Sequence, residues 1–266
     1  MADAIAASAS LTHINLGDNQ IGFECSKYMA DAIAASVSLR SILLPSNWLN
    51  VDAAKHIAKG IHLSSLTSID LSFSGIDDER AEYIAGGISI STSLASIDLE
   101  ANKICTDGGK AIAKAISNSA SLTRINLAYN RINSEGAKHI ANGISKSSSL
   151  THIELQMNQI GSEGAKHIAD GIRVSASLTS IDLGENCIGC EGAAHIAEGI
   201  AVSTSLTSID LGCNIIGAEG AKDIATAISF SASLRTADLR NNCFGLNAEE
   251  ELRLAVKDRA CFQLDL

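Results

Sequence analysis

The stretch SLTSIDLGENCIG occupies Ser177–Gly189, and a near copy, SLTSIDLGCNIIG, occupies Ser205–Gly217, 28 residues further on. The underlying pattern, L-x-x-I-x-L-x-x-N-x-I, returns through most of the chain. A period of about 20–50 residues is typical of repeat proteins, in which each unit packs on its neighbours. The nine copies are 28 residues apart, except for one step of 27 from Leu39 to Leu66, and they begin at Leu11, Leu39, Leu66, Leu94, Leu122, Leu150, Leu178, Leu206 and Leu234.

The first half of each repeat predicts a short strand followed by a turn. In Leu178–Leu183 the residues Ile181 and Leu183 alternate with polar residues, which indicates a strand with one buried face. The third residue after Leu183 is an asparagine, and the equivalent position is asparagine in every other repeat except one, which has Ser74. We expect the asparagine amide to form hydrogen bonds with backbone groups of the neighbouring repeat. This asparagine column comprises Asn19, Asn47, Asn102, Asn130, Asn158, Asn186, Asn214 and Asn242.

A second turn signal lies three residues after the asparagine column. Glycine, asparagine or aspartate recurs there in every copy except at Cys105. These residue types tolerate a positive φ, so we expect a left-handed turn at this position.

The second half of each repeat predicts a helix, for example EGAKHIADGIRV at Glu163–Val174. Ala165, Ile168 and Ile172 recur at helical spacing and form the expected buried stripe. The position of Gly171 holds only glycine or alanine in the other copies, which favours close contact between neighbouring helices.

The stretch LTSIDLGENCIGCEGAAHIAEGI, at Leu178–Ile200, resembles leucine-rich repeats of the ribonuclease-inhibitor type, and the resemblance covers essentially the whole chain. It implies an α/β leucine-rich-repeat solenoid, a horseshoe with a parallel sheet on the concave face and helices on the convex face. Strand spacing of about 4.8 Å against helix spacing of about 8–10 Å bends such a stack toward the strands. We expect one domain over 1–266.

The two ends of the array differ. MADAIAAS at Met1–Ser8 returns at Met29–Ser36, so residues 1–10 are a partial repeat, whether Met1 is a natural start or a fragment boundary. We expect the apolar residues near this end to fray or to promote self-association: Ile5, Leu11, Ile14 and Leu16. Residues 246–266 are expected to form a C-terminal cap, with a helix at Asn247–Val256 and a last strand in CFQLDL.

Composition excludes several classes of function. The net charge of −10 argues against nucleic-acid binding, which needs basic surface. There is no run of 18 apolar residues for a membrane span and no signal-peptide pattern at the start. Seven cysteines without a paired framework favour a reducing, intracellular and cytoplasmic setting.

No cofactor, metal or enzymatic chemistry is predicted. Walker, GxSxG, HExxH and GxGxxG motifs are absent from the sequence. Cys187 and Cys190 form an isolated CxxC, more simply explained as structural than as a metal or redox site. His139, His167 and His195 recur on successive helices about 8–10 Å apart, too far to share one ion easily.

Candidate binding residues lie on the predicted strands. Acidic side chains recur at one strand position and are expected to point into the concave opening. They are either copied with the repeat or form a binding surface for a cationic partner. This acidic column comprises Asp70, Asp98, Glu154, Asp182, Asp210 and Asp238. Larger residues interrupt it centrally, as in a protein-binding hot spot: Arg124, Asn126, Tyr129, His152 and Met157. Leu43, Trp48 and Phe73 form a second cluster, and chance drift among repeats remains the alternative for both.

The expected function is non-enzymatic binding of a protein with a basic surface on the concave face. Arrays of near-identical repeats of this type are familiar in the sensor regions of NOD-like receptors and in effectors that intracellular bacteria deliver into host cells, and both settings remain open. The alternative is a regulator of a small GTPase, such as the Ran GTPase-activating protein, whose catalytic residues have no matching motif here.

Overall fold

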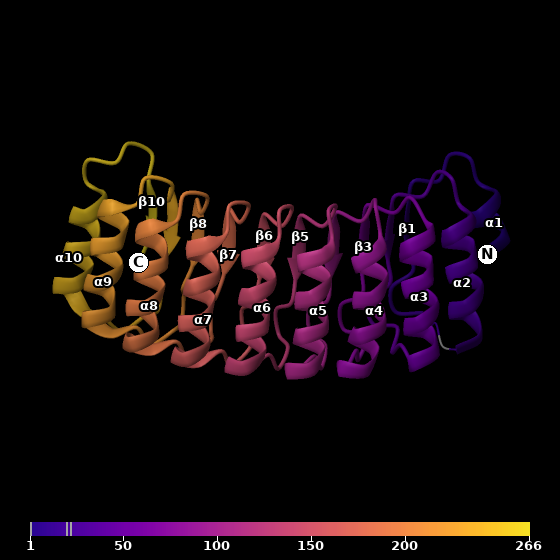
Figure 1. Ribbon diagram of the computed structural model, residues 1–266, viewed down its shortest axis with the longest axis horizontal. Helices are drawn as coiled ribbons and strands as arrows, with labels where there is room; N and C mark the ends of the chain where they lie inside the picture. Colours follow the sequence, from indigo (N-terminus) through magenta and orange to yellow (C-terminus); the bar gives the residue numbers. More distant parts are fainter. Residues whose placement is uncertain (1, 20, 22) are drawn as a thin grey trace. The chain divides into compact units, whose positions relative to one another are not determined.

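The computed structural model describes residues 2–19, 21 and 23–266, and the chain divides into two compact units, Met1–Asn130 and Arg131–Leu266. Each unit alternates short strands with longer helices, which lie side by side in chain order (Figure 1). The first contains α1 (Ala2–Ala7), β1 (His13–Asn15), α2 (Phe23–Ala35), β2 (Ser41–Leu43), α3 (Val51–Leu63), β3 (Ser68–Asp70), α4 (Asp78–Ile90), β4 (Ser96–Asp98), α5 (Thr106–Asn118) and β5 (Arg124–Asn126). The second contains α6 (Ser134–Lys146), β6 (His152–Glu154), α7 (Gly161–Val174), β7 (Ser180–Asp182), α8 (Gly189–Val202), β8 (Ser208–Asp210), α9 (Gly217–Phe230), β9 (Thr236–Asp238), α10 (Gly245–Val256) and β10 (Gln263–Asp265).

Within each unit consecutive strands pair in parallel and in repeat register. Ile69 of β3 lies beside Ile97 of β4, and Ile181 of β7 lies beside Ile209 of β8. The central residue of each strand from β2 to β9 is buried toward the helices, while its two neighbours face away from them. The predicted strand pattern is therefore confirmed.

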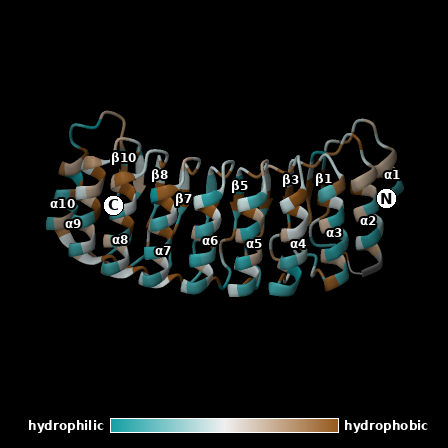
Figure 2. Ribbon diagram, in the orientation of Figure 1, coloured by the Kyte–Doolittle hydropathy of each residue, from teal (hydrophilic) through white to brown (hydrophobic). Residues whose placement is uncertain are grey.

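The helices cover one face of the strands, and their apolar residues gather between the two layers (Figure 2). In α7 the buried side chains include Ala165, Ile168 and Ile172, as predicted. A Cβ added at Gly171 would lie 2.9 Å from the carbonyl oxygen of Ala141 on α6, so the backbones of neighbouring helices approach closely and the predicted need for small residues is confirmed. No helix in the part of the chain that the structure describes is long and apolar enough to cross a membrane.

The asparagine column links one repeat to the next. The Nδ2 of Asn186 donates to the carbonyl oxygens of Leu183 (3.1 Å) and Gly184 (3.0 Å), and to that of Leu155 in the preceding repeat (2.9 Å). Its Oδ1 accepts from the backbone N–H of Asn158 at 2.9 Å. These bonds satisfy backbone groups that water cannot reach, so the predicted role of the column is confirmed.

The main left-handed turn lies one residue before the asparagine column. In each repeat the residue there has a φ between 52° and 61°: Asp18, Ser46, Phe73, Ala101, Tyr129, Met157, Glu185, Cys213 and Asn241. The periodicity of the sequence did not reveal this turn, because most of these residues are not typical of a left-handed backbone.

The turn predicted three residues after the column is only partly present. Gly161, Gly189, Gly217 and Gly245 have positive φ as expected, and Gly22 lies outside the described residues. The prediction is wrong for Asn50, Asp77 and Asn133, which have an extended backbone because their side chains cap the following helix.

The end of the second unit follows the repeat pattern. Helix α10 begins two residues before the predicted start, and β10 pairs in parallel with β9. At the other end of the chain Ile5 and Leu16 are buried and Leu11 and Ile14 are half-buried. A single domain, the C-terminal cap and self-association stay predictions.

Candidate protein-binding surface

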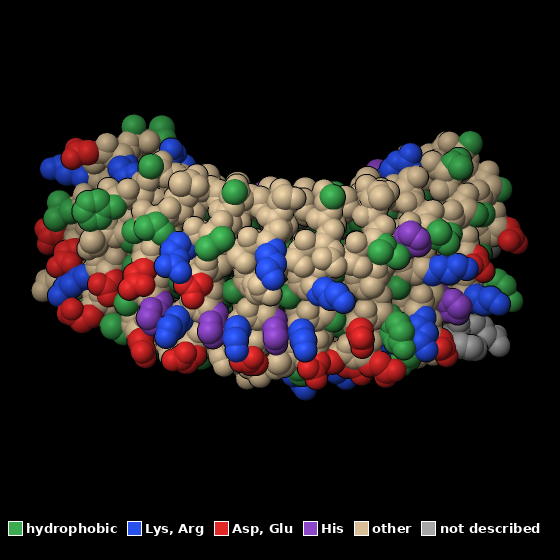
Figure 3. Space-filling model, in the orientation of Figure 1, with side chains coloured by type: hydrophobic (Ala, Val, Ile, Leu, Met, Phe, Trp, Pro, Cys, Tyr) green, Lys and Arg blue, Asp and Glu red, His purple; other side chains and the backbone are tan. Residues whose placement is uncertain are grey.

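Two surfaces of each unit differ in character. The helix face carries charged side chains of both signs (Figure 3). The opposite surface, which we call the strand face, consists of the outward residues of the strands and of the turns that follow them. The sequence-predicted binding residues all belong to the strand face.

The acidic column occupies the last position of its strands. Asp70 lies beside Asp98 in the first unit, and Glu154, Asp182, Asp210 and Asp238 follow one another in the second. One carboxylate oxygen of each aspartate accepts the backbone N–H two residues later, at 2.8 Å for Asp182 and Gly184. Asn126 accepts from Ala128 in the same way. These aspartates therefore hold the turn, and the second oxygen is left for other interactions.

Burial and mutual repulsion perturb this column. Burial, with the carboxylates of Asp210, Glu154 and Asp238, raises the pKa of Asp182 to about 6. Burial likewise raises the pKa of Asp210. Burial also acts on Asp238, but hydrogen bonds and the charge of Arg240 outweigh it and lower the pKa of that carboxyl.

Arg240 was missed at the sequence level. Its Nε donates to both carboxylate oxygens of Asp238, at 3.0 and 2.9 Å. The signal was a basic residue two positions after an aspartate, where Gly184 and Gly212 stand in the preceding repeats.

The large predicted residues are outward but divide between the units. Tyr129 is 44% exposed in the first unit and Met157 is 39% exposed in the second, both on left-handed backbone. Arg124 is exposed on β5, and His152 on β6 is half-buried, with Nδ1 2.7 Å from the hydroxyl of Thr151. Arg124 and Tyr129 belong to the first unit and His152 and Met157 to the second, so their assembly into one patch stays a prediction.

The first unit brings together residues that the sequence did not connect. The amide of Asn126 donates to Glu100 (3.1 Å) and to Asp98 (3.3 Å). Trp48 is 69% exposed, and the ammonium of Lys103 lies 5.7 Å from the centroid of its ring. Glu100 and Lys103 were missed; Glu100 stands where most repeats have a small or uncharged residue.

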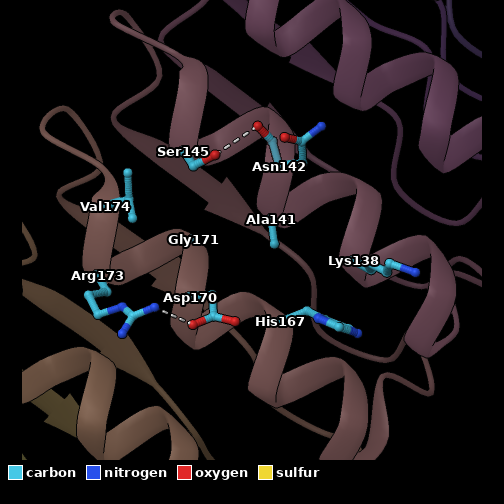
Figure 4. A pocket seen from close by; sticks show the side chains of 9 residues that line it. All are labelled: Lys138, Ala141, Asn142, Ser145, His167, Asp170, Gly171, Arg173 and Val174. Atoms are coloured by element: carbon cyan, nitrogen blue, oxygen red, sulfur yellow. Dashed lines mark hydrogen bonds and ion pairs between the residues drawn. The ribbon is translucent and has the colours of Figure 1, made fainter.

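The helix face of the second unit has an open groove of about 260 Å³ between α6 and α7 (Figure 4). Asp170 in its lining pairs with Arg173 at 2.8 Å, and the hydroxyl of Ser145 donates to the carbonyl of Asn142 at 3.0 Å. His167 also lines the groove. The hydroxyl of Ser145 is thus engaged within α6, and the carboxylate of Asp170 within α7.

The histidine, cysteine and acidic side chains form neither a metal site nor a disulfide in the part of the chain that the structure describes. Among the residues that it describes, no three histidine, cysteine, aspartate or glutamate side chains are close enough to hold a metal ion. Within the same range each of the seven cysteines is free.

The parallel strands, the helices in register and the buried asparagine column define a solenoid of repeated strand–turn–helix units. The chain belongs to the leucine-rich repeat family, whose model matches slightly more than half of it, at residues 7–24, 62–85, 118–141, 146–169, 174–197 and 202–225. The ribonuclease-inhibitor type of repeat is confirmed, because a full helix follows each strand from β1 to β9.

Similar solved structures include actin-binding site 2 of leiomodin-1, with 16% identity over 57% of this chain and 85% of that chain, and a TM-score of 0.49. Another is the C-terminal domain of tropomodulin from Caenorhabditis elegans, with 12% identity over 64% of this chain and 87% of that chain, and a TM-score of 0.42. No curated protein matches the sequence.

Proposed function

We propose that the chain is a non-enzymatic scaffold that binds a partner protein with a basic surface on its strand face. The observation that carries the proposal is the placement of exposed Tyr129 and Met157 in a turn that contributes little to the core. Other repeats use Asp18 or Asn241 at this position, so the backbone itself does not require a large side chain.

Charge supports a basic partner. Asp182, Asp210 and Asp238 follow one another in register, and the whole chain carries a net charge of −10. A surface with one sign of charge attracts and orients a partner of the opposite sign. Tyr129 would then supply short-range contact, because aromatic side chains dominate many protein interfaces.

The setting is part of the proposal. Seven free thiols, most of them exposed, fit a reducing compartment such as the cytoplasm. A receptor sensor region and an effector delivered into a host cell both satisfy this condition.

The test compares partner capture by matched variants. The strand-face variant carries alanine at Arg124, Tyr129, His152 and Met157, and the control carries alanine at the exposed helix residues Lys114, Lys166, Asp170 and Glu198. A cross-linking amino acid at Tyr129 or Lys166 then identifies which face touches the captured protein. We expect loss of capture only in the strand-face variant. Capture through the helix face, or stimulation of GTP hydrolysis by a panel of small GTPases, would contradict the proposal.

A further inference from the structure

The turns after β2 to β5 place four residues of the first unit in a row: Ser46, Phe73, Ala101 and Tyr129. The backbone N–H of Phe73 donates to the carbonyl of Glu100, and that of Ala101 to Ala128, each at 3.0 Å. Neighbouring members of the row are therefore about 4.8 Å apart, as in a sheet. Because Ala101 has only a methyl group, a gap separates Phe73 from Tyr129, about 10 Å wide between their Cα atoms. We call it the ring gap.

The fold does not need the two aromatic residues at these positions. Phe73 is 55% exposed and Tyr129 is 44% exposed, so both remain accessible to solvent and neither belongs to the buried core. Both have a φ of 54°, which is unfavourable for bulky side chains. Residues that give little to stability and occupy strained backbone are candidates for a role in binding.

Two carboxylates of the strand face, those of Asp98 and Glu100, come just before Ala101 in the same repeat. Glu100 directly precedes Ala101, and its Oε2 accepts from Nδ2 of Asn126 at 3.1 Å. The same nitrogen donates to Asp98 at 3.3 Å, so two acids share one neutral amide. The ion pairs of the described residues include neither Glu100 nor Asp98. This place therefore has negative charge without a cation to balance it.

The same surface already contains one cation on an aromatic ring. Lys103 lies 5.7 Å from the centroid of Trp48, and the indole packs over Gly75, where an added Cβ would be 3.3 Å from Cε3. The cation–ring contacts of the described residues involve neither Phe73 nor Tyr129. The rings beside the gap are thus open to a cation from another molecule.

We propose that the ring gap binds an arginine side chain of the basic partner. A guanidinium is flat and can lie about 3.5–4 Å from a ring on either side, which a gap of about 10 Å accommodates. It also presents a fork of N–H groups that matches a carboxylate, here Glu100. A lysine ammonium cannot stack in this way. The inference rests on the proposed function and names the group that the strand face recognises.

Three 12-residue glycine–serine peptides test the assignment, with three arginines, three lysines or three citrullines. Citrulline keeps the planar group without the charge, and lysine keeps the charge without the plane. In NMR titrations we expect the arginine peptide to bind about fivefold or more tightly than the others, because stacking and charge act together. The largest shifts should fall on the amides of Phe73, Ala101 and Tyr129.

Filling the gap provides the decisive variant. Ala101→Phe places a side chain that the equivalent position already accepts as Phe73, so we expect it to fold and to lose the preference for arginine. Cys213→Phe introduces the same residue at the equivalent position in the second unit and should keep that preference. Equal affinity for the arginine and lysine peptides, unchanged binding by Ala101→Phe, or no saturable binding of any peptide overturns the inference.

Failure of the arginine assignment can be distinguished from failure of the proposed function. If the partner is captured through the strand face by Ala101→Phe as well as by the parent, the arginine assignment alone is wrong. If the partner is captured through the helix face, the proposed function is wrong as well.

Discussion

Asn186 shows why an amide recurs in every repeat but one. Its side chain donates two protons and accepts on the oxygen, so one residue serves backbone groups of its own and of the preceding repeat. Ser74, the exception, reaches the carbonyls of Ser72 (3.1 Å) and Leu44 (3.3 Å) with a single hydroxyl. The asparagine column is therefore a hydrogen-bonding device between repeats.

We predict that Asn186→Ala lowers the free energy of unfolding by about 3 kcal/mol or more, because several buried backbone groups lose their partners. Asn186→Ser should cost less, since the repeat of Ser74 tolerates serine. Urea denaturation measures both, with the exposed Asn142→Ala as control. A loss below about 1 kcal/mol for Asn186→Ala would show that water replaces these bonds.

The ionised carboxylate of Asp182 destabilises the folded state. Its pKa is raised to about 6 in the folded chain, against about 3.9 in an unfolded one. The folded state therefore binds a proton more tightly than the unfolded state. The contribution of protonated Asp182 to the stability of the fold is fully present below about pH 4 and is lost as pH rises through about 6.

We predict that Asp182→Asn stabilises the chain by about 1–2 kcal/mol at pH 7.5 and by almost nothing near pH 4, after allowance for solvent screening. The amide can keep the turn, as Asn126 does with Ala128 at 2.9 Å. Thermal or urea unfolding across this pH range measures the difference.

Asp238→Asn is the control of opposite sign, because Arg240 lowers the pKa of that carboxyl despite its burial. Its ionised form is favoured in the fold, so neutralising it should destabilise the chain at neutral pH. If Asp182→Asn and Asp238→Asn changed the free energy of unfolding in the same direction at pH 7.5, this electrostatic account would be refuted.

Helices begin in three ways in this molecule. In α6 the side chain of Asn133 accepts the backbone N–H of Gly136 at 3.1 Å. In α7 the corresponding residue is Gly161, which has a φ of 65° and no side chain to cap with. Helix α5 is preceded by Cys105, whose side chain makes no capping hydrogen bond, and Asp78 of α4 accepts from the backbone N–H of Cys105 at 2.7 Å.

We predict that Asn133→Ala costs about 1 kcal/mol of stability, because the first turn of α6 loses its cap. Asn133→Gly should lower the stability by only a few tenths of a kcal/mol. Asn142→Ala, in the middle of the same helix, is the matched control and should be neutral or slightly stabilising. Chemical denaturation of the three variants gives the comparison, and equal effects at both positions would argue against capping.

At the scale of the whole molecule, charge rather than shape sets the expected behaviour in association. Under the proposed function, the net charge of −10 would attract a basic partner from a distance, and the acidic column would direct it to the strand face. Exposed charges separated by more than about 10 Å are screened at ordinary salt concentrations. The column should therefore act mainly on the rate of encounter.

We predict that Asp182→Asn together with Asp210→Asn slows association with the captured partner several-fold at low salt and much less at about 0.5 M salt. The control pair Glu191→Gln and Glu198→Gln changes the net charge equally, but on exposed positions of α8. Surface plasmon resonance at two salt concentrations measures the rates. Equal slowing by both pairs would mean that net charge, and not the strand face, steers the partner.

The sequence by itself determined the repeat, its elements and the buried residues. This succeeded because each element is local: Ile181 and Leu183 alternate within one strand, and Ile168 and Ile172 recur within one helix. It also identified the acidic column as outward residues, since alternation along a strand decides which side chains face away from the helices.

Only the tertiary structure decided what neighbouring repeats do to one another. The left-handed turn at Tyr129, the capping of α5 by Asp78 and the sharing of one amide by Asp98 and Glu100 depend on atoms that are 26 or more residues apart in sequence or on the backbone that such contacts impose. A repeating pattern shows which positions correspond, but not how far a side chain reaches into the next repeat. That distance is set by the packing of strands and helices, which the sequence encodes only through the whole fold.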